Sequence, residues 1–390
     1  MLFLNKNRNK ENTKRKIVIF ASAAWPAQGV GGPIESIHRN CLQFSKTGYR
    51  VEVFSTYFGI EKNSIKNNLI IFNDNYRARF FKSAYTLKFI SNILRINRSD
   101  MIIIEDIFWP VCYLIMLISA IKKNKIICIY PRGVLSLAAF KSKSTILKNL
   151  YINIFSLYKD IVCTNLIFIF TSKIELKKAK EVISFRNYKV IPNRANLNTA
   201  HYQKLTTKNN FFQQSIGSEK IILIVGRVAK QKRLFEALEI ISHVNESISC
   251  KIFVVGPEGN DIDFLKKEIN KRPNFIKYFG EVDQQNLAEF YSIADALIVT
   301  SQDENFGNVI LEALSHYCPV LTNDTNPWLM LNQDKSGVCA PPGMSYMTRG
   351  LTEILKNKRD YYLSGCDTTV SRFSNEVIDL KWQDLINEYK

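Results

Sequence analysis

One short segment combines two glutamates with an amide-rich turn, a set of groups that could bind a polyol and a phosphate together. Glu304 and Glu312 are separated by seven residues, with Asn305-Phe306-Gly307-Asn308 between them. The apolar run 296–300 predicts a buried strand before this segment, and the residues after it predict a helix with Val309, Ile310, Ala313 and Leu314 facing the core. Glu304 would then lie in the loop above the strand, and Glu312 about two turns into the helix. Carboxylates can accept bonds from sugar hydroxyls, and the free N–H groups of a helix N-terminus suit an anion.

A second segment places cations directly after a strand. The run 220–225 predicts a strand that ends at Gly226, and Arg227, Lys230 and Lys232 follow it. Arg227 can form a planar fork with phosphate oxygens and Lys232 can add a point charge, so together they could neutralise a departing diphosphate. The alternative is a solvated basic helix start, which is disfavoured because cations are unfavourable at a helix N-terminus. We interpret Lys230 as a surface residue.

The order of elements predicts two α/β domains. At 390 residues the chain exceeds the usual size of a single core, and both halves alternate strand-like runs with helical patterns, as parallel sheets covered by helices do. We expect a first domain at 1–200, a second at 201–372 after a polar linker near 196–218, and an amphipathic terminal helix within 373–390. The expected strands are 16–21, 50–55, 100–105, 125–130, 165–171, 189–191, 220–225, 251–255, 276–279, 296–300 and 319–322.

Composition argues against several other classes of protein. The eight cysteines include no C-x-x-C pair and the four histidines show no metal-ligand spacing, so we expect neither a disulfide framework nor a zinc site. The apolar run 107–121 is shorter than the ~20 residues that span a bilayer and predicts a buried helix. The basic N-terminus has no apolar core of a signal peptide. We therefore expect a soluble protein of the cytoplasm.

The net charge of +18 calls for an acidic partner or surface. No nucleic-acid-binding motif accompanies the charge, so we expect no nucleic acid partner. An anionic membrane is the favoured surface, with the protein peripheral at the inner face of the plasma membrane. An AT-rich genome, which favours Lys and Asn codons, would also produce such a composition.

The whole phrase from Glu304 to Glu312, with its preceding strand, resembles the signature of the retaining glycosyltransferases of family 4, which have the GT-B fold. Gly226, Arg227 and Lys232 match the family pattern, whereas Arg233 stands where a glycine is usual. Tyr130-Pro131-Arg132-Gly133 resembles a Pro-Arg-Gly subgroup common among bacterial surface-polysaccharide enzymes. The resemblance implies two Rossmann-like parallel-sheet domains that face a cleft.

The resemblance also implies roles for individual residues. Arg227 and Lys232 would stabilise the departing diphosphate, Glu304 would hold hydroxyls of the donor sugar, and Glu312 would bind the ribose. The remaining candidates would bind substrate through backbone groups or side chains: Gly31 and Gly32 of the glycine-rich loop before a helix that opens at Pro33, Arg132, Val282 near the base, and the turn residues Asn305, Phe306 and Gly307. Arg132 could equally be a turn residue paired with a carboxylate, and Glu105-Asp106 could bind acceptor or cap the next helix.

The activity implied is retaining, metal-independent hexosyl transfer from a nucleoside-diphosphate sugar to a glycan or lipid-linked saccharide in capsule, O-antigen or exopolysaccharide synthesis. No cofactor is expected, because two protein cations and helix N-termini already balance the diphosphate. Three alternatives stay open at this point. A GT-B nucleotide-sugar epimerase would turn over donor alone, a non-catalytic sugar-nucleotide binding protein would not turn it over, and a nucleic-acid binder would be indifferent to substitution of Glu304.

Overall fold

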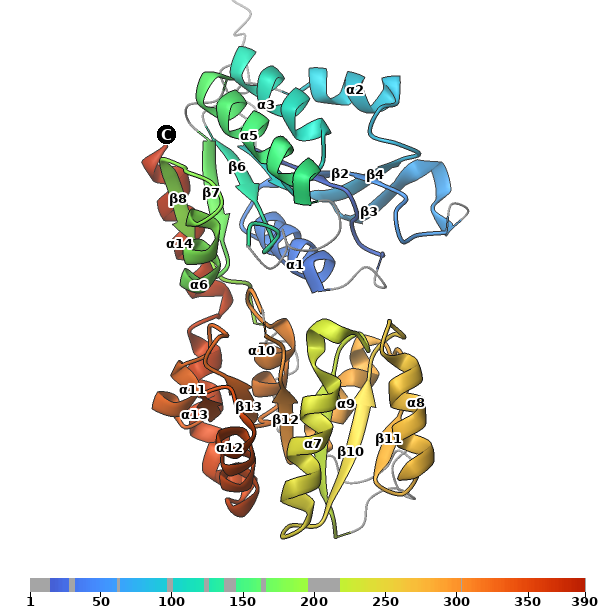
Figure 1. The fold of residues 1–390 in the computed structure, drawn as a ribbon. Coiled ribbons are helices and arrows are strands. Elements are labelled where there is room, and N and C mark those ends of the chain that lie inside the picture. The colour runs from blue at the N-terminus through green and yellow to red at the C-terminus, as the bar shows by residue number, and fades with distance from the viewer. Residues whose placement is uncertain are drawn as a thin grey trace, which may run out of the picture. The chain divides into compact units, whose positions relative to one another are not determined.

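The computed structural model describes residues 15–27, 32–61, 64–96, 101–122, 126–136, 145–162, 166–195, 218–302 and 304–389. Contacts between these residues divide the chain into two units, each built around its own sheet (Figure 1). The first unit comprises Met1–Phe170, Lys180–Lys189 and Asp384–Lys390, and the second comprises Thr171–Ala179 and Val190–Gln383. The α/β class with two parallel-sheet domains is confirmed.

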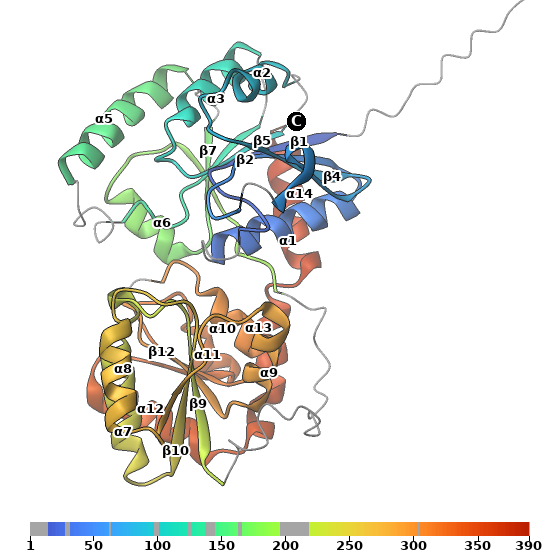
Figure 2. The ribbon, with the colours of Figure 1, turned by 90° about the vertical axis from the view of Figure 1, so that its right-hand side faces the viewer.

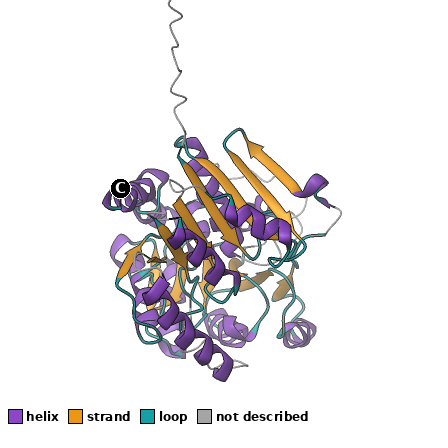
Figure 3. Cartoon of the chain, turned by 90° about the horizontal axis from the view of Figure 1, so that it is seen from above, coloured by secondary structure: helices purple, strands orange, loops and turns teal. Residues whose placement is uncertain are grey.

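The sheet of the first unit has the strand order β3-β4-β2-β1-β5-β6-β7-β8. The pairs from β4 to β7 are parallel, while β3 pairs with β4 in the antiparallel sense. Its strands are β1 (Lys16–Ala21), β2 (Arg50–Thr56), β3 (Leu69–Asn73), β4 (Tyr76–Phe81), β5 (Met101–Glu105), β6 (Ile127–Tyr130), β7 (Leu166–Phe170) and β8 (Asn187–Val190). Seen from above, these strands run side by side with helices packed along them (Figure 3).

Helices cover both faces of the first sheet. α1 (Gly32–Lys46) lies on one side, and α2 (Leu87–Leu94), α3 (Val111–Ile121) and α5 (Thr145–Val162) lie together on the other (Figures 1 and 2). The apolar strands β1, β5, β6 and β7 are almost wholly buried between these layers, as near-continuous hydrophobic runs require. The expectation that the run 107–121 forms a buried helix holds for one face of α3 only, since Ile121 at its end is 71% exposed.

The sheet of the second unit has the order β11-β10-β9-β12-β13-β14, and all of its registered pairs are parallel. Numbered from its own first strand, this is the order 3-2-1-4-5-6 of a doubly wound fold. The strands are β9 (Lys220–Val225), β10 (Cys250–Val255), β11 (Ile276–Tyr278), β12 (Ala296–Val299), β13 (Val320–Asn323) and β14 (Gly337–Ala340). The chain runs outward from β9 in one direction and resumes from β12 in the other, so the switch point lies between these two neighbours.

Two helices and a 3₁₀ turn of the second unit flank the switch point, and further helices pack around the rest of its sheet. α10 (Asn308–Ser315) follows β12, α7 (Leu234–Asn245) follows β9, and the short 3₁₀ turn η5 (Lys230–Lys232) lies between β9 and α7. The others are α6 (Lys173–Lys180), α8 (Ile262–Lys271), α9 (Gln284–Ile293), α11 (Met330–Asp334), α12 (Met344–Lys356), α13 (Leu363–Ser371) and α14 (Asn375–Glu388), with the 3₁₀ turn η6 (Arg359–Tyr362). The first unit has a 3₁₀ turn of its own, η3 (Lys66–Asn68). α6 and α14 each contribute residues to both units. None of the helices in the described part of the chain is long and apolar enough to cross a bilayer.

Two glycines meet where β9 and β10 end. Gly226 and Gly256 both have positive φ, +139° and +144°, and the Gly226 N–H donates to the Val255 carbonyl at 2.9 Å. A Cβ on Gly256 would lie 2.2 Å from the Gly226 carbonyl oxygen. The close approach of these two backbones therefore excludes any side chain at Gly256 and fixes the path of the loop after β9.

The substitution Gly256→Ala is expected to lower the free energy of unfolding by about 3 kcal/mol or more, because it adds a backbone clash to an unfavourable φ. Gly280→Ala is the matched control, since Gly280 has φ +71° but a Cβ on it would meet no heavy atom within 4 Å beyond its chain neighbours. It should cost about 1 kcal/mol. Urea unfolding followed by circular dichroism measures both, and equal losses would contradict the close approach of Gly226 and Gly256.

Candidate active site

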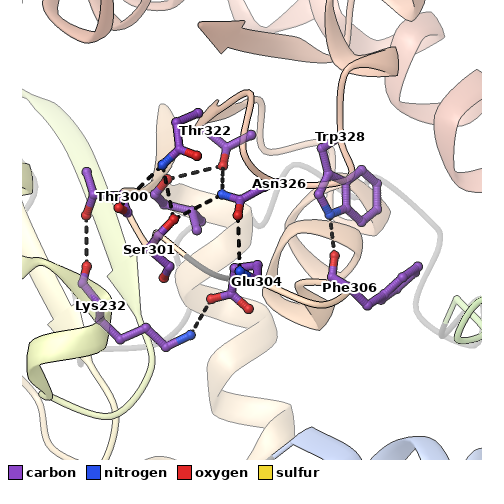
Figure 4. Close-up of polar contacts among 10 residues, drawn as sticks. Lys232, Thr300, Ser301, Glu304, Phe306, Thr322, Asn326 and Trp328 are labelled. Atoms are coloured by element: carbon purple, nitrogen blue, oxygen red, sulfur yellow. Dashed lines mark hydrogen bonds and ion pairs between the residues drawn. The ribbon is translucent and has the colours of Figure 1, made fainter. Parts of the chain in front are cut away.

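The switch point of the second sheet brings together two candidate residues that are 72 positions apart. Lys232 follows β9, Glu304 follows β12, and the Lys232 ammonium forms an ion pair with Glu304 Oε1 (Figure 4). The Lys232 side chain is 34% exposed and that of Glu304 14%. Ligands of open parallel sheets bind outside the carboxyl ends of the strands at such a point. The pair therefore presents a cation for an anionic group beside an acceptor for hydroxyls.

Two contacts hold Lys232 in this position. The hydroxyl of Thr300, at the end of β12, donates to the Lys232 carbonyl at 2.9 Å and so ties the 3₁₀ turn η5 to the neighbouring strand. The aliphatic part of Lys232 lies over Gly226, because a Cβ there would be 3.5 Å from Lys232 Cε. Gly226 thus allows the turn after β9, and its lack of a side chain leaves room for Lys232 to extend to Glu304.

The turn that carries Glu304 is held by a buried amide that the sequence did not single out. Asn326 is fully buried, and its Nδ2 donates to Thr322 Oγ1 at 2.9 Å and to the Ser301 carbonyl at 3.3 Å. Its Oδ1 accepts from the Glu304 N–H at 3.2 Å. The amide of Asn326 therefore binds the turn at Ser301 and at Glu304 (Figure 4), and buried amides satisfied in this way rigidify the segment that they bind.

The next residues of the turn direct their carbonyls toward the protein. The Asn305 carbonyl accepts from Ser172 Oγ at 2.8 Å, and the Phe306 carbonyl accepts from Trp328 Nε1 (Figure 4). In a trans peptide the N–H points opposite to the carbonyl. The N–H groups of Phe306 and Gly307 therefore point away from Ser172 and Trp328.

Gly307 and the aromatic side chains around it explain why this turn is Asn-Phe-Gly. Gly307 caps α10 with φ +81°, and a Cβ there would lie 3.2 Å from Trp328 Nε1. Phe306 is buried, with its ring centroid 5.4 Å from those of Trp328 and Phe373. The phenyl ring anchors the turn in the core, while the glycine allows the helix to begin in a left-handed conformation.

Glu312 lies in α10 as expected. Ile310, Ala313 and Leu314 of the same helix are buried and Val309 is half-buried, so Glu312 is held on a half-buried face. Tyr291 Oη donates to Glu312 Oε2 at 3.3 Å. At the start of the helix, Asn193 Nδ2 donates to Asn308 Oδ1 at 2.8 Å.

Arg227 and Val282 lie at the same edge of the second sheet. Arg227 is exposed just after Gly226, and its stem passes Gly259, where a Cβ would lie 3.0 Å from Arg227 Cγ. Val282 follows Gly280 in the loop after β11 and is half-buried against the core of the unit. Both stand beyond the carboxyl ends of strands, the edge to which the sequence assigned them.

The remaining candidates belong to the first unit. Gly32 is the exposed first residue of α1, while Gly31 lies outside the described residues. Arg132, with φ +54°, forms a two-point ion pair with Glu105, at 2.7 Å from Nε to Oε2 and 3.1 Å from Nη2 to Oε1. Its guanidinium also lies 4.2 Å from the centroid of the Tyr130 ring. Of the two interpretations of Arg132, the structure shows the turn residue paired with a carboxylate, and a contact with substrate stays a prediction.

Asp106, next to Glu105, forms a local turn and does not cap α3, whose N-cap is Pro110 without a side-chain cap bond. Its Oδ1 accepts from the Phe108 N–H at 2.9 Å in the turn that leads to α3. Burial raises the pKa of Asp106 above its usual range, with the Glu105 charge as a smaller cause in the same direction. Within the described ranges, no three His, Cys, Asp or Glu side chains are placed to hold a metal ion.

Comparison with known proteins identifies a family for the second half of the chain. Residues 206–363 match the model of the family described as glycosyl transferases, group 1. An uncharacterized glycosyltransferase of Methanocaldococcus jannaschii, MJ1607, is 28% identical over 190 residues, which are 46% of this chain and 47% of that protein. The chain spans about half the length of the curated relatives it matches, or less.

Two solved structures share the fold over nearly the whole chain. WaaG, a glycosyltransferase involved in lipopolysaccharide biosynthesis, superposes with a TM-score of 0.67 at 13% identity, over 94% of this chain and 98% of its own. Anabaena HepE in complex with UDP and glucose gives a TM-score of 0.68 at 14% identity, over 96% and 100%. These likenesses establish the architecture of the chain.

Arg233 adopts the conformation that a glycine would favour at this position, with φ 50° and ψ 48°. Its side chain pairs with Glu236 at 2.9 Å, an exposed pair of small energetic value. We expect Arg233→Gly to unfold with a free energy about 1 kcal/mol higher than Arg233→Ala, because both lose the ion pair and only glycine relieves the left-handed strain. Urea denaturation of the two variants measures the difference, and a more stable alanine variant would refute the assignment of strain.

His316, at the end of α10, should make stability depend on pH. Burial, with the Arg359 charge as a second cause, lowers the pKa of His316 from 6.5 to about 4. The unfolded chain therefore binds a proton below pH 6.5 that the folded chain does not bind until about pH 4. The contribution of neutral His316 is complete above pH 6.5, and about 3 kcal/mol of stability should be lost between pH 6.5 and 4. The midpoint of urea unfolding, measured at several pH values in this range, should depend less on pH in His316→Gln than in the unaltered protein. The control His243→Gln, at an exposed histidine, should keep the pH dependence of the unaltered protein. An equal pH dependence in the two variants would contradict the assignment.

Proposed function

We propose that this chain, whose residues 206–363 match the model of the group 1 glycosyl transferases, transfers a sugar from a nucleoside-diphosphate sugar with retention of anomeric configuration. The acceptor is a glycan or lipid-linked saccharide of a bacterial surface polysaccharide. The observation that carries the proposal is the apposition of Lys232 and Glu304 at the switch point of the second sheet. A cation and a carboxylate on adjacent strand ends match a substrate that joins a diphosphate to a polyol.

Each group at this edge has a task in the proposed reaction. Lys232 and the exposed Arg227 neutralise the diphosphate as it departs, the charge that develops most in the transition state. Glu304 accepts hydrogen bonds from the donor sugar, and the N–H groups of Phe306 and Gly307 donate to it or to phosphate. Glu312 accepts from the ribose hydroxyls. Since the ammonium of Lys232 already contacts Glu304, donor phosphate would share this cation with the carboxylate and so bring phosphate and sugar into one fixed geometry.

Two proteins of similar fold support the substrate class. HepE, which has the same architecture, is described in complex with UDP and glucose, and WaaG is described as acting in lipopolysaccharide biosynthesis. We propose a nucleoside diphosphate as the leaving group and a surface saccharide as the acceptor on this basis. The proposal includes no metal and no covalent intermediate, and the departing phosphate itself accepts the proton of the attacking hydroxyl.

Glu304→Gln and Lys232→Met should each lower kcat by about 100-fold or more, because each removes a charge used in the transition state. Release of nucleoside diphosphate from a panel of sugar nucleotides, with and without membranes of the source organism as acceptor, measures the loss. The matched control is Glu258→Gln with Lys266→Met, which removes an exposed ion pair of the same unit at 3.2 Å. These control variants should remain within about twofold of the unaltered protein.

The same assay separates the competing functions. Turnover of donor in the absence of any acceptor would indicate an epimerase, and donor binding without turnover would indicate a binding protein. Normal rates in both Glu304→Gln and Lys232→Met would refute the site. The anomeric configuration of the product, read by NMR, tests retention, and an unchanged rate in EDTA is expected if no metal takes part.

A further inference from the structure

The helices α2, α3 and α5, on one side of the first sheet, expose an unusual amount of apolar surface. Of the 19 large hydrophobic side chains exposed in the described ranges, ten belong to these three helices. α3 packs against both of its neighbours, so the three helices form one layer (Figures 1 and 2). The ten are Leu87, Leu94, Leu117, Ile121, Ile146, Leu147, Leu150, Ile154, Leu157 and Ile161. Apolar side chains scattered singly are normal on a protein surface, whereas a concentration of this kind marks an interaction surface.

Six of the ten form a continuous stripe along α5. At about 100° per residue, positions 146, 147, 150, 154, 157 and 161 fall within one sector of the helix about 100° wide. We call these six residues the α5 stripe. All are more than half exposed, from 52% at Ile154 to 84% at Ile146.

The stripe is distinct from the face by which α5 packs on its own unit. Ile152 and Phe155 are buried on that face, and the Tyr113 ring of α3 lies 5.8 Å from the Phe155 ring, centroid to centroid. A helix of a globular protein needs one apolar face to join its core. α5 has two, and the second is turned to solvent.

The charge of the protein is concentrated in the half of the chain that carries this layer. Residues 1–195 contain 32 Lys and Arg against 11 Asp and Glu, a net charge of +21, whereas residues 196–390 contain 21 against 24, a net charge of −3. The three helices and the residues that cap α2 and α3 contain a single acid, Asp160, which pairs with the buried Lys159. The other cations of this layer are Lys88, Arg95, Lys122 and Lys148. The composition of the genome would raise the charge of both halves, so it does not account for this asymmetry.

We propose that the α5 stripe inserts into the interface of an anionic lipid bilayer, with α5 lying in the plane of the membrane. Aliphatic side chains would enter the boundary between headgroups and acyl chains, and the cations of this half would be attracted to the lipid phosphates. A second copy of the chain is disfavoured as the occupant, because it would bring together two chain halves that each have a net charge of +21. An anionic bilayer would both bury the apolar side chains of the stripe and attract the positive charge.

This inference adds to the proposed function the surface at which a lipid-linked acceptor would be met, and its test needs no sugar nucleotide. The full-length protein is sedimented with vesicles of phosphatidylcholine alone and with vesicles that contain phosphatidylglycerol. Binding is expected only to the anionic vesicles, and it should weaken as NaCl is raised. The variant Leu150→Gln with Leu157→Gln should bind at least about tenfold more weakly, because it removes two side chains of the stripe.

The matched control replaces two leucines of similar exposure in the second unit, Leu329→Gln with Leu380→Gln, and it should bind as the unaltered protein does. Changes at such exposed positions have small effects on stability, and circular dichroism verifies that each variant is folded.

Equal binding by the two double variants would overturn the assignment to α5. Failure of the unaltered protein to bind anionic vesicles would overturn the proposal that a membrane covers the stripe. A dimer would overturn it too, if sedimentation velocity without vesicles shows a concentration-dependent dimer that is lost only in Leu150→Gln with Leu157→Gln. Because vesicle binding is measured without donor, it can fail or succeed independently of transferase activity.

Discussion

The pairing of β9 with β12 is the contact on which the rest of the candidate site depends. Two registered pairs, Ala296 with Ile222 and Leu297 with Leu223, join strands whose sequences are separated by β10 and β11. Because the pairing is parallel, the loops after both strands emerge at the same edge, and the chain leaves each strand in a different direction across the sheet. Loops that diverge in this way leave room for a ligand between them. Lys232 and Glu304 meet there as a consequence of topology, and an insertion or deletion within either strand would shift one of them along the edge and separate them.

Buried polar contacts convert this topology into a fixed geometry. The turn residues Glu304 to Gly307 lead into α10, which begins from the left-handed residue Gly307. The shape of this turn is maintained by side chains from other segments: Asn326 holds its start, while Ser172 and Trp328 donate hydrogen bonds to the carbonyls of Asn305 and Phe306. Each of these donors would be costly to leave unpaired in the core. In the reaction proposed above, a turn that is already ordered would stabilise charge through its N–H groups without a reorganisation during the reaction.

Sequence reasoning located the strands with continuous apolar runs and the residues at their ends, because both signals are local. β1 and β9 begin and end where the runs predict, and Lys232 and Glu304 were identified from type and position. β3, β4 and β14 were missed. β4 (Tyr76–Phe81) interleaves two arginines with its apolar residues and β14 consists of small residues, whereas the apolar run at the start of β3 is a signal that could have located it. Asn326, Ser172 and Trp328 were missed for a different reason. Their role arises from contacts across 22 to 133 positions, and a single sequence carries no local pattern for such a contact.

The two halves of the chain carry their positive charge in different ways, in a short loop of the second half and across the whole of the first half. The second half has a net charge of −3, yet Arg227, Lys230, Lys232 and Arg233 lie within seven consecutive positions after β9. Attraction of an anionic donor to this half therefore depends on a short cationic loop that acts within about one Debye length, roughly 8–10 Å at moderate salt. The first half, at +21, produces a field that acts over a broad surface instead. A small phosphate responds to the first arrangement and an extended anionic surface to the second, so the two halves are suited to partners of different size even though both partners are negative.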